Sequence, residues 1–67
     1  MSVLKVIEVL SSSPESWEDA TKKAVEKASE TVKGIRSIYI KEQNAVVNDG
    51  KITQFRVNAK ITFEVMD

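Results

Sequence analysis

Oxygen-bearing side chains are the part of this sequence best suited to chemistry. Glu15, Glu42, Asn44 and Asp49 carry carboxylate or amide oxygens, which are the ligands that calcium and magnesium take. None of them lies in an EF-hand loop, so a complete ligand set would need two or three copies meeting at a symmetry axis. We predict a divalent-cation site of this kind, with Glu42 as the first candidate ligand, then Glu15, and then Asn44 and Asp49.

Each of these candidate ligands also has a structural interpretation. Glu15 would lie near the start of a helix, where its charge complements the helix dipole. Asp49 belongs to Asn48-Asp49-Gly50, a sequence typical of a hairpin turn. Glu42 could be an ordinary surface charge. Both interpretations stay open from the sequence alone.

A planar or anionic ligand is the second chemistry that the residues allow. Tyr39 shares a strand face with Ser37 and could cover either a ligand or an interface. Arg56 lies on the polar face of the last predicted strand, where it could bind a phosphate or carboxylate or form an ion pair between subunits. Trp17 could stack on a ligand, but its place on an apolar helix stripe favours a core or interface anchor.

Most catalytic chemistry is excluded by composition. The chain has no His and no Cys, which rules out Ser–His triads, thiol nucleophiles and imidazole or thiolate metal sites. It has two glycines and no phosphate-binding loop motif. A carboxylate general acid such as Glu8 is conceivable, although pairing with a Lys or Arg on a neighbouring strand is the simpler interpretation. We predict that the protein is not an enzyme.

Four elements in the order β–α–β–β must position these residues. The pattern predicts a strand over Val3–Leu10 and a helix with Ser13 as N-cap, Pro14 at its first position and Gly34 at its end. Two further strands, over 34–47 and 51–67, flank the turn. We predict an α+β fold of one domain, residues 1–67, with a three-stranded antiparallel sheet in spatial order 1-3-2 folded over one helix.

The small size of the chain and its charge set limits on its partners. Sixty-seven residues form a marginal core that usually needs disulfides, a metal or oligomerisation, and without Cys we favour oligomerisation. Ten basic and ten acidic residues cancel, which argues against nucleic-acid or membrane-surface binding. The first ten residues are too short and too charged for a signal peptide or a membrane span. We predict a cytoplasmic protein.

The sequence as a whole resembles the dodecins. The matching features are the V-I-E strand (6–8), the S-S-P-x-S-W helix entry (12–17), the Ala-rich helix followed by T-V (31–32), and the final F-x-V-x-x-K-I-x-F-E-V strand (55–65). The resemblance implies a small β–α–β–β protein that assembles as a hollow homododecamer with cubic-type symmetry. The two long predicted strands, which one helix cannot cover, agree with such an assembly.

Two departures from the family's flavin site separate this chain from many dodecins. The resemblance implies flavin pairs stacked on an aromatic of the second strand, with a glutamine of the third strand bonding the ring edge. These positions fall on Ser37, which has no π-face, and on Arg56, which has no acceptor. The I-R-x-x-x-x-x-E-Q (35–43) and G-K-I-T (50–53) segments resemble the calcium-dodecin branch, which implies divalent-ion sites near the symmetry axes.

Three functions therefore remain. The first is a non-enzymatic dodecameric binding or storage protein with calcium or a similar divalent cation between subunits. The second is a dodecin that binds riboflavin or FMN in a remodelled pocket, in which Tyr39 or Arg56 replaces the missing contacts. The third is a structural shell without a specific ligand.

Overall fold

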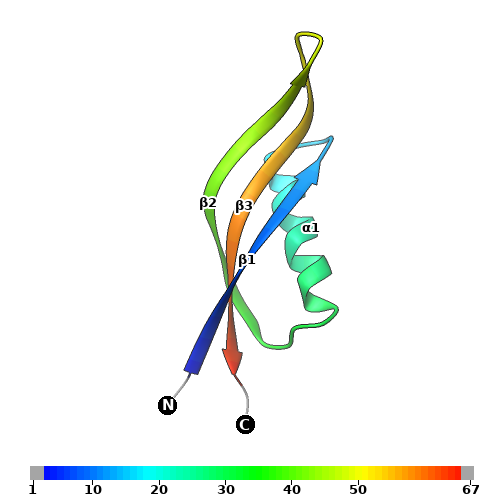
Figure 1. The fold of residues 1–67 in the computed structure, drawn as a ribbon. Helices are drawn as coiled ribbons and strands as arrows, with labels where there is room; N and C mark the ends of the chain where they lie inside the picture. Colours follow the sequence, from blue (N-terminus) through cyan, green and yellow to red (C-terminus); the bar gives the residue numbers. More distant parts are fainter. Residues whose placement is uncertain (1–2, 66–67) are drawn as a thin grey trace.

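The computed structural model describes residues 3–65 and has the predicted order of elements. β1 (Val3–Ser13) is followed by α1 (Trp17–Ser29), β2 (Ile35–Asn48) and β3 (Lys51–Val65) (Figure 1). The strand order is β1-β3-β2, with β3 antiparallel to both neighbours. The fold class and sheet topology are confirmed; the last two residues of the predicted final strand, 66–67, lie outside the described residues.

The hairpin formed by β2 and β3 extends beyond the end of β1. Asp49 (φ 54°) and Gly50 (φ 74°) both adopt the left-handed conformation, as the predicted turn requires. The last residue of β1, Ser13, pairs with Phe55, so the residues of β3 before Phe55 have only β2 beside them. Figure 1 shows this part of the hairpin projecting beyond the end of β1.

The start of the helix differs from the prediction. Ser16, not Ser13, is the N-cap, and its Oγ accepts the backbone N–H of Asp19 at 2.9 Å. Pairing with Phe55 keeps Ser13 in β1, where it is fully buried. Its hydroxyl accepts the N–H of Glu15 and donates to Asp19 at 2.5 Å. Pro14 therefore lies in the connection before the helix and not at its first position.

The end of the helix also comes earlier than predicted. α1 ends at Ser29, and Gly34 lies in the connection to β2 with φ 77°. The carbonyl of Gly34 accepts the N–H of Glu64 at 2.9 Å. An added Cβ at Gly34 would lie 3.1 Å from the Glu64 carbonyl oxygen. Glycine is thus required by a close approach to β3 and not by the helix end.

The hydrophobic core lies between α1 and the middle of β3. Ala20 and Ala24 of the helix pack on Val57, Ala59 and Ile61, and all five are buried. Alanine allows the helix to lie close to the sheet, but the core that results is small. Within residues 3–65, no helix is long and apolar enough to cross a membrane.

Candidate functional site

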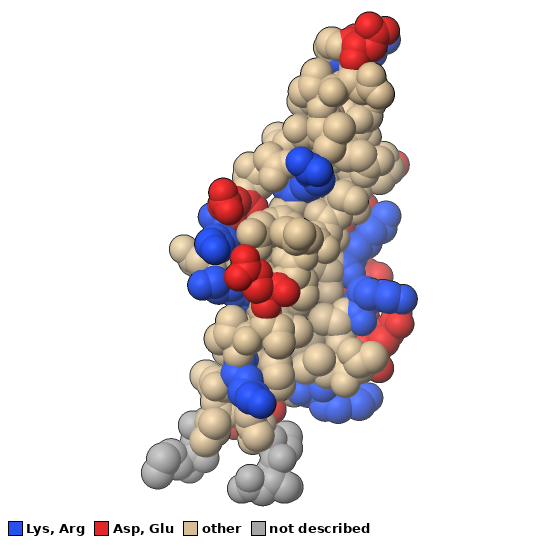
Figure 2. Space-filling model, in the orientation of Figure 1, with Lys and Arg blue, Asp and Glu red and all other residues tan. Residues whose placement is uncertain are grey.

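The sheet face turned away from α1, called here the outer face, carries most of the residues that could bind a ligand. Along β3 its residues alternate with the buried Val57, Ala59 and Ile61. Strand register then assembles four rows across the sheet: Ser12–Arg56–Asn44, Leu10–Asn58–Glu42, Glu8–Lys60–Tyr39 and Val6–Thr62–Ser37. Figure 2, in the orientation of Figure 1, shows side chains of both charge signs interspersed with uncharged surface.

A β-bulge in β2 brings Glu42 to the outer face. The register with β3 shifts between Ile40, which pairs with Ala59, and Glu42, which pairs with Asn58. If β2 were regular, Lys41 would follow Ile40 on the outer face and Glu42 would point toward the helix; the bulge at Lys41 instead pairs Glu42 with Asn58. The bulge therefore places Glu42 opposite Asn58 on the outer face, where the Cβ atoms of paired residues usually lie about 4.5–5.5 Å apart.

The amide oxygen of Asn58 has an unusual environment. Oδ1 is buried and has no hydrogen-bond partner among residues 3–65. Leaving a buried acceptor unpaired costs about 1–3 kcal/mol, and such atoms are commonly explained by a water or an ion. Glu42, beside it, forms no ion pair or side-chain hydrogen bond within the same residues. A carboxylate and a neutral amide oxygen together suit a hard cation.

One copy of the chain does not provide a complete metal site. Residues 3–65 contain no cluster of three or more His, Cys, Asp or Glu side chains that could hold a metal ion. Calcium takes about 6–8 oxygen ligands, so Glu42 and Asn58 could supply only part of its coordination. The remaining oxygens would have to come from water or from other copies.

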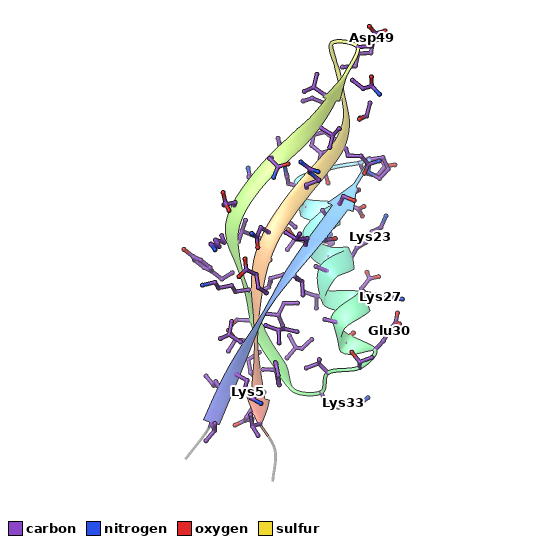
Figure 3. All side chains as sticks on the ribbon, viewed as in Figure 1. Lys5, Lys23, Lys27, Glu30, Lys33 and Asp49 are labelled. Carbon is purple, nitrogen blue, oxygen red and sulfur yellow. The ribbon has the colours of Figure 1, made fainter. Side chains whose placement is uncertain are left out.

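The other predicted ligands lie at different places. Asn44 is on the outer face, one row from Glu42, and its Oδ1 accepts the Nε–H of Arg56 at 2.8 Å. Glu15 lies in the connection between β1 and α1 and is exposed. Asp49 lies at the tip of the hairpin (Figure 3). It lies seven positions after Glu42, or about 20 Å along an extended strand.

The positions that match the family's flavin site are also separated within one chain. Ser37 pairs with Thr62, whereas Arg56 lies six residues earlier on β3, about 20 Å away along the strand. Tyr39 is on the same face as both and is 66% exposed. A pocket that used Ser37 and Arg56 together would therefore need residues from more than one copy.

The row that contains Arg56 is supported by the helix. Trp17 donates its indole N–H to the backbone carbonyl of Asn44 at 2.9 Å. Its ring also lies edge-on against Phe55, with centroids 4.9 Å apart. Trp17 thus connects the start of α1 to both strands of the hairpin, which confirms the predicted anchor.

Glu8, the candidate general acid, has a structural partner. Its Oε2 lies 3.6 Å from Nζ of Lys41, and both side chains are about half exposed. The register places Lys60 opposite Glu8, but the ion pair crosses β3 to reach the bulge residue of β2. The ion pair expected from the sequence is present, with a partner one strand farther away.

Comparison with known proteins gives one consistent result. The Dodecin family model matches residues 3–66. The calcium dodecin of Mycobacterium tuberculosis is 41% identical over 66 residues, which cover 97% of this chain and 92% of that protein. A crystal structure of the calcium dodecin from this species, described as a calcium-chelating antigen with a novel calcium-binding site, superposes with a TM-score of 0.83. It is 38% identical, and the match covers 97% of this chain and 93% of that one.

A more distant relative has the same fold. The dodecin of Streptomyces davaonensis superposes with a TM-score of 0.94 at 24% identity, covering 98% of this chain and 97% of that one. Dodecins are non-enzymatic proteins that bind small ligands, in agreement with the composition. Because the family model covers nearly all of the sequence, the chain belongs to the dodecin family.

Proposed function

We propose that this protein is a calcium-binding dodecin, a homododecameric binding or storage protein with divalent cations held between its copies. The observation that carries the proposal is the buried Oδ1 of Asn58, which has no hydrogen-bond partner among residues 3–65 and belongs to the residue that pairs with Glu42. The similarity to the calcium dodecin of Mycobacterium tuberculosis supports it independently. Glu42 is the ligand with the charge, and Asn58 is a neutral ligand next to it.

An assembly is supported by the surface that one chain leaves exposed. Leu4, Val6, Leu10 and Tyr39 are all more than half exposed on the outer face. The helix covers only the opposite face, so these side chains lose contact with water only if other copies cover them. Additional copies would also bring the oxygens that the site lacks in one chain. The native mass is expected to be twelve times that of one chain.

Calcium binding can be tested through its effect on stability. A ligand that binds only the folded state stabilises it by about 2.7 kcal/mol at a hundredfold excess over its Kd. We expect calcium to raise the unfolding midpoint of the wild type and to release or absorb heat in a calorimetric titration. Glu42→Gln keeps the size of the side chain but removes its charge, and should weaken calcium binding by at least about tenfold.

The matched control is Glu26→Gln on α1. It removes the same charge from an exposed residue outside the outer face. Equal weakening by both substitutions would show that calcium responds to net charge and would refute the proposed ligand. A dodecamer whose stability and calorimetric heat do not respond to calcium would support the structural shell instead.

Flavin binding is the second candidate, and the exposed face of Tyr39 is the observation that favours it. An aromatic ring on the outer face could stack on a planar ligand without the residue missing at Ser37. The test is a titration of riboflavin and FMN followed by quenching of flavin fluorescence. Quenching that is lost in Tyr39→Ala would support this candidate, and absence of quenching in the wild type would reject it.

A further inference from the structure

A groove lies between β1 and α1, on the helix side of the sheet. It has a volume of about 540 Å³, and its apolar lining includes Ile7, Val9, Ala24, Ala28 and Val32. Apart from Ala24, these side chains are only half-buried in one chain. Among residues 3–65 no strand lies beyond β1. The helix therefore covers the middle of the sheet and leaves this flank open.

Charged side chains of both signs border the groove. Lys23, Lys27 and Glu30 line it, and Figure 3 shows them following one another along α1 to its C-terminal end. Lys23 pairs with Asp19 at 3.0 Å, and Lys27 pairs with Glu30 at 3.4 Å. Exposed ion pairs contribute at most about 1 kcal/mol each, so these charges can exchange their partners for charges of another molecule at little cost.

The end of the β2–β3 hairpin, residues 46–54, called here the arm, has no support from the rest of its chain. It lies beyond the last residue of β1 and consists of two strands and a turn (Figure 1). An isolated two-stranded hairpin is only marginally stable in water. Val47 and Ile52 pair across the arm and are 65% and 53% exposed. The arm thus presents an apolar pair that one chain leaves uncovered.

The charges of the arm match those of the groove. Asp49 and Lys51, at and beside the turn, form no ion pair within residues 3–65. The groove has Lys23 for the carboxylate and Glu30 for the ammonium group. Figure 3 shows Asp49 at one end of the molecule and Glu30 toward the other. The arm therefore cannot enter the groove of its own chain.

We propose that the arm docks in the groove between β1 and α1 of a second copy of the chain. Val47 and Ile52 lie against the apolar lining, Asp49 pairs with Lys23, and Lys51 pairs with Glu30. Arm and groove are different surfaces, so the contact is heterologous and closes into a ring in a finite assembly. The inference rests on the homododecamer proposed above and names two surfaces through which its copies meet, both separate from the proposed calcium ligands.

Cross-linking measures this contact directly, because the wild type has no Cys. The test chain combines Val47→Cys in the arm with Lys27→Cys in the groove, and is treated with a short bismaleimide. We expect a covalent ladder in denaturing electrophoresis that ends at the size of one ring. The matched control combines Val47→Cys with Lys22→Cys. Lys22 is also an exposed, ion-paired lysine of α1 but does not line the groove, so this chain should give the single-chain band.

A pair of arm variants tests the apolar part of the contact. Ile52→Asp would place a carboxylate against the apolar lining, so the assembled species should be lost from the native mass distribution. Thr53→Asp adds the same charge to the next residue of the same strand, whose side chain points to the opposite side of the arm, and should keep the native mass. Far-UV circular dichroism of both variants checks that the chains are folded.

Three results would overturn the proposed contact. One is equal cross-linking through Lys27→Cys and Lys22→Cys, and another is no cross-linking through either in an assembled protein. The third is an unchanged native mass in Ile52→Asp. Each of these leaves the homododecamer itself standing, whereas a monomeric wild type would remove both proposals. None of the measurements uses calcium, so the calorimetric titration decides the cation site separately.

Discussion

The two faces of the sheet differ in how their side chains are covered. On the face toward α1, Val57, Ala59 and Ile61 are closed off by the helix and are nearly or completely inaccessible to water. On the outer face, apolar side chains remain exposed, and the buried Oδ1 of Asn58 has no partner within residues 3–65. The helix covers the middle of its face within one chain, whereas the outer face has apolar side chains that no element of the same chain covers. Stability and function are therefore separable by face.

The largest effect that tests this comparison is the loss of a core side chain. Ile61→Ala should lower the free energy of unfolding by about 2–5 kcal/mol, because Ile61 is fully buried and the small core cannot close the cavity. Chemical denaturation measures the change. The neighbouring outer-face substitution, Thr62→Ala, should change it by less than about 0.5 kcal/mol. Similar losses for both would show that the two faces contribute equally to stability.

A substitution at Asn58 sharpens the comparison on the outer face. Asn58→Leu keeps the approximate shape and removes the unpaired acceptor, so in EGTA it should raise the free energy of unfolding by about 1 kcal/mol. In saturating calcium the wild type should become more stable than Asn58→Leu, because only the wild type keeps the amide ligand and is stabilised by calcium binding. Thermal unfolding of both proteins, with and without calcium, provides the measurement.

The control for Asn58→Leu is Gln54→Leu. It removes an amide from the same face of the same strand, and Gln54 has no buried unpaired atom among the described residues. Its effect should stay within about 0.5 kcal/mol and should not depend on calcium. If calcium also changed the stability of Gln54→Leu relative to wild type, the effect of the ion would depend on polar side chains of the outer face in general and not on Asn58.

The helix face was largely predictable from the sequence, since local patterns determine it. Alternation along the last strand, the alanines of α1 and the turn at Asn48-Asp49-Gly50 each indicate one structure. The helix start was predicted wrongly because Ser13 and Ser16 are both good caps with a proline between them. Pairing of Ser13 with Phe55 decides between them, and this long-range contact leaves no local signal.

The candidate site on the outer face was predictable only in part. Glu42 was proposed as a ligand from its residue type, whereas Asn58 was not among the predicted ligands. Its place on the polar face of the last strand was visible, whereas its partner across the sheet depends on the bulge at Lys41. A one-residue shift in register changes which side chains meet, and no turn or glycine marks the bulge in the sequence.

The smallest expected effect concerns Asp19, where the end of β1 meets the helix. The hydrogen bond from Ser13 and that from Lys23 lower the pKa of Asp19 below its ordinary value of 3.8. A carboxyl whose pKa is lower in the folded state binds protons more readily when unfolded. Its contribution to stability is therefore present above the unfolded pKa and is lost as the pH falls through the folded value.

Comparison of two variants over a pH series isolates this contribution. Asp19→Asn should lower the unfolding midpoint at neutral pH, and the difference from wild type should shrink once the pH falls below the unfolded pKa of 3.8. Glu18→Gln, which removes an exposed carboxylate that pairs with Lys22 in the same helical turn, should show a smaller difference at neutral pH. A difference for Asp19→Asn that stays constant into acid would mean that Ser13 and Asp19 stabilise the junction independently of charge. The packing of α1 on the sheet would then need no ionised group, in contrast to the charged side chains proposed to act on the outer face.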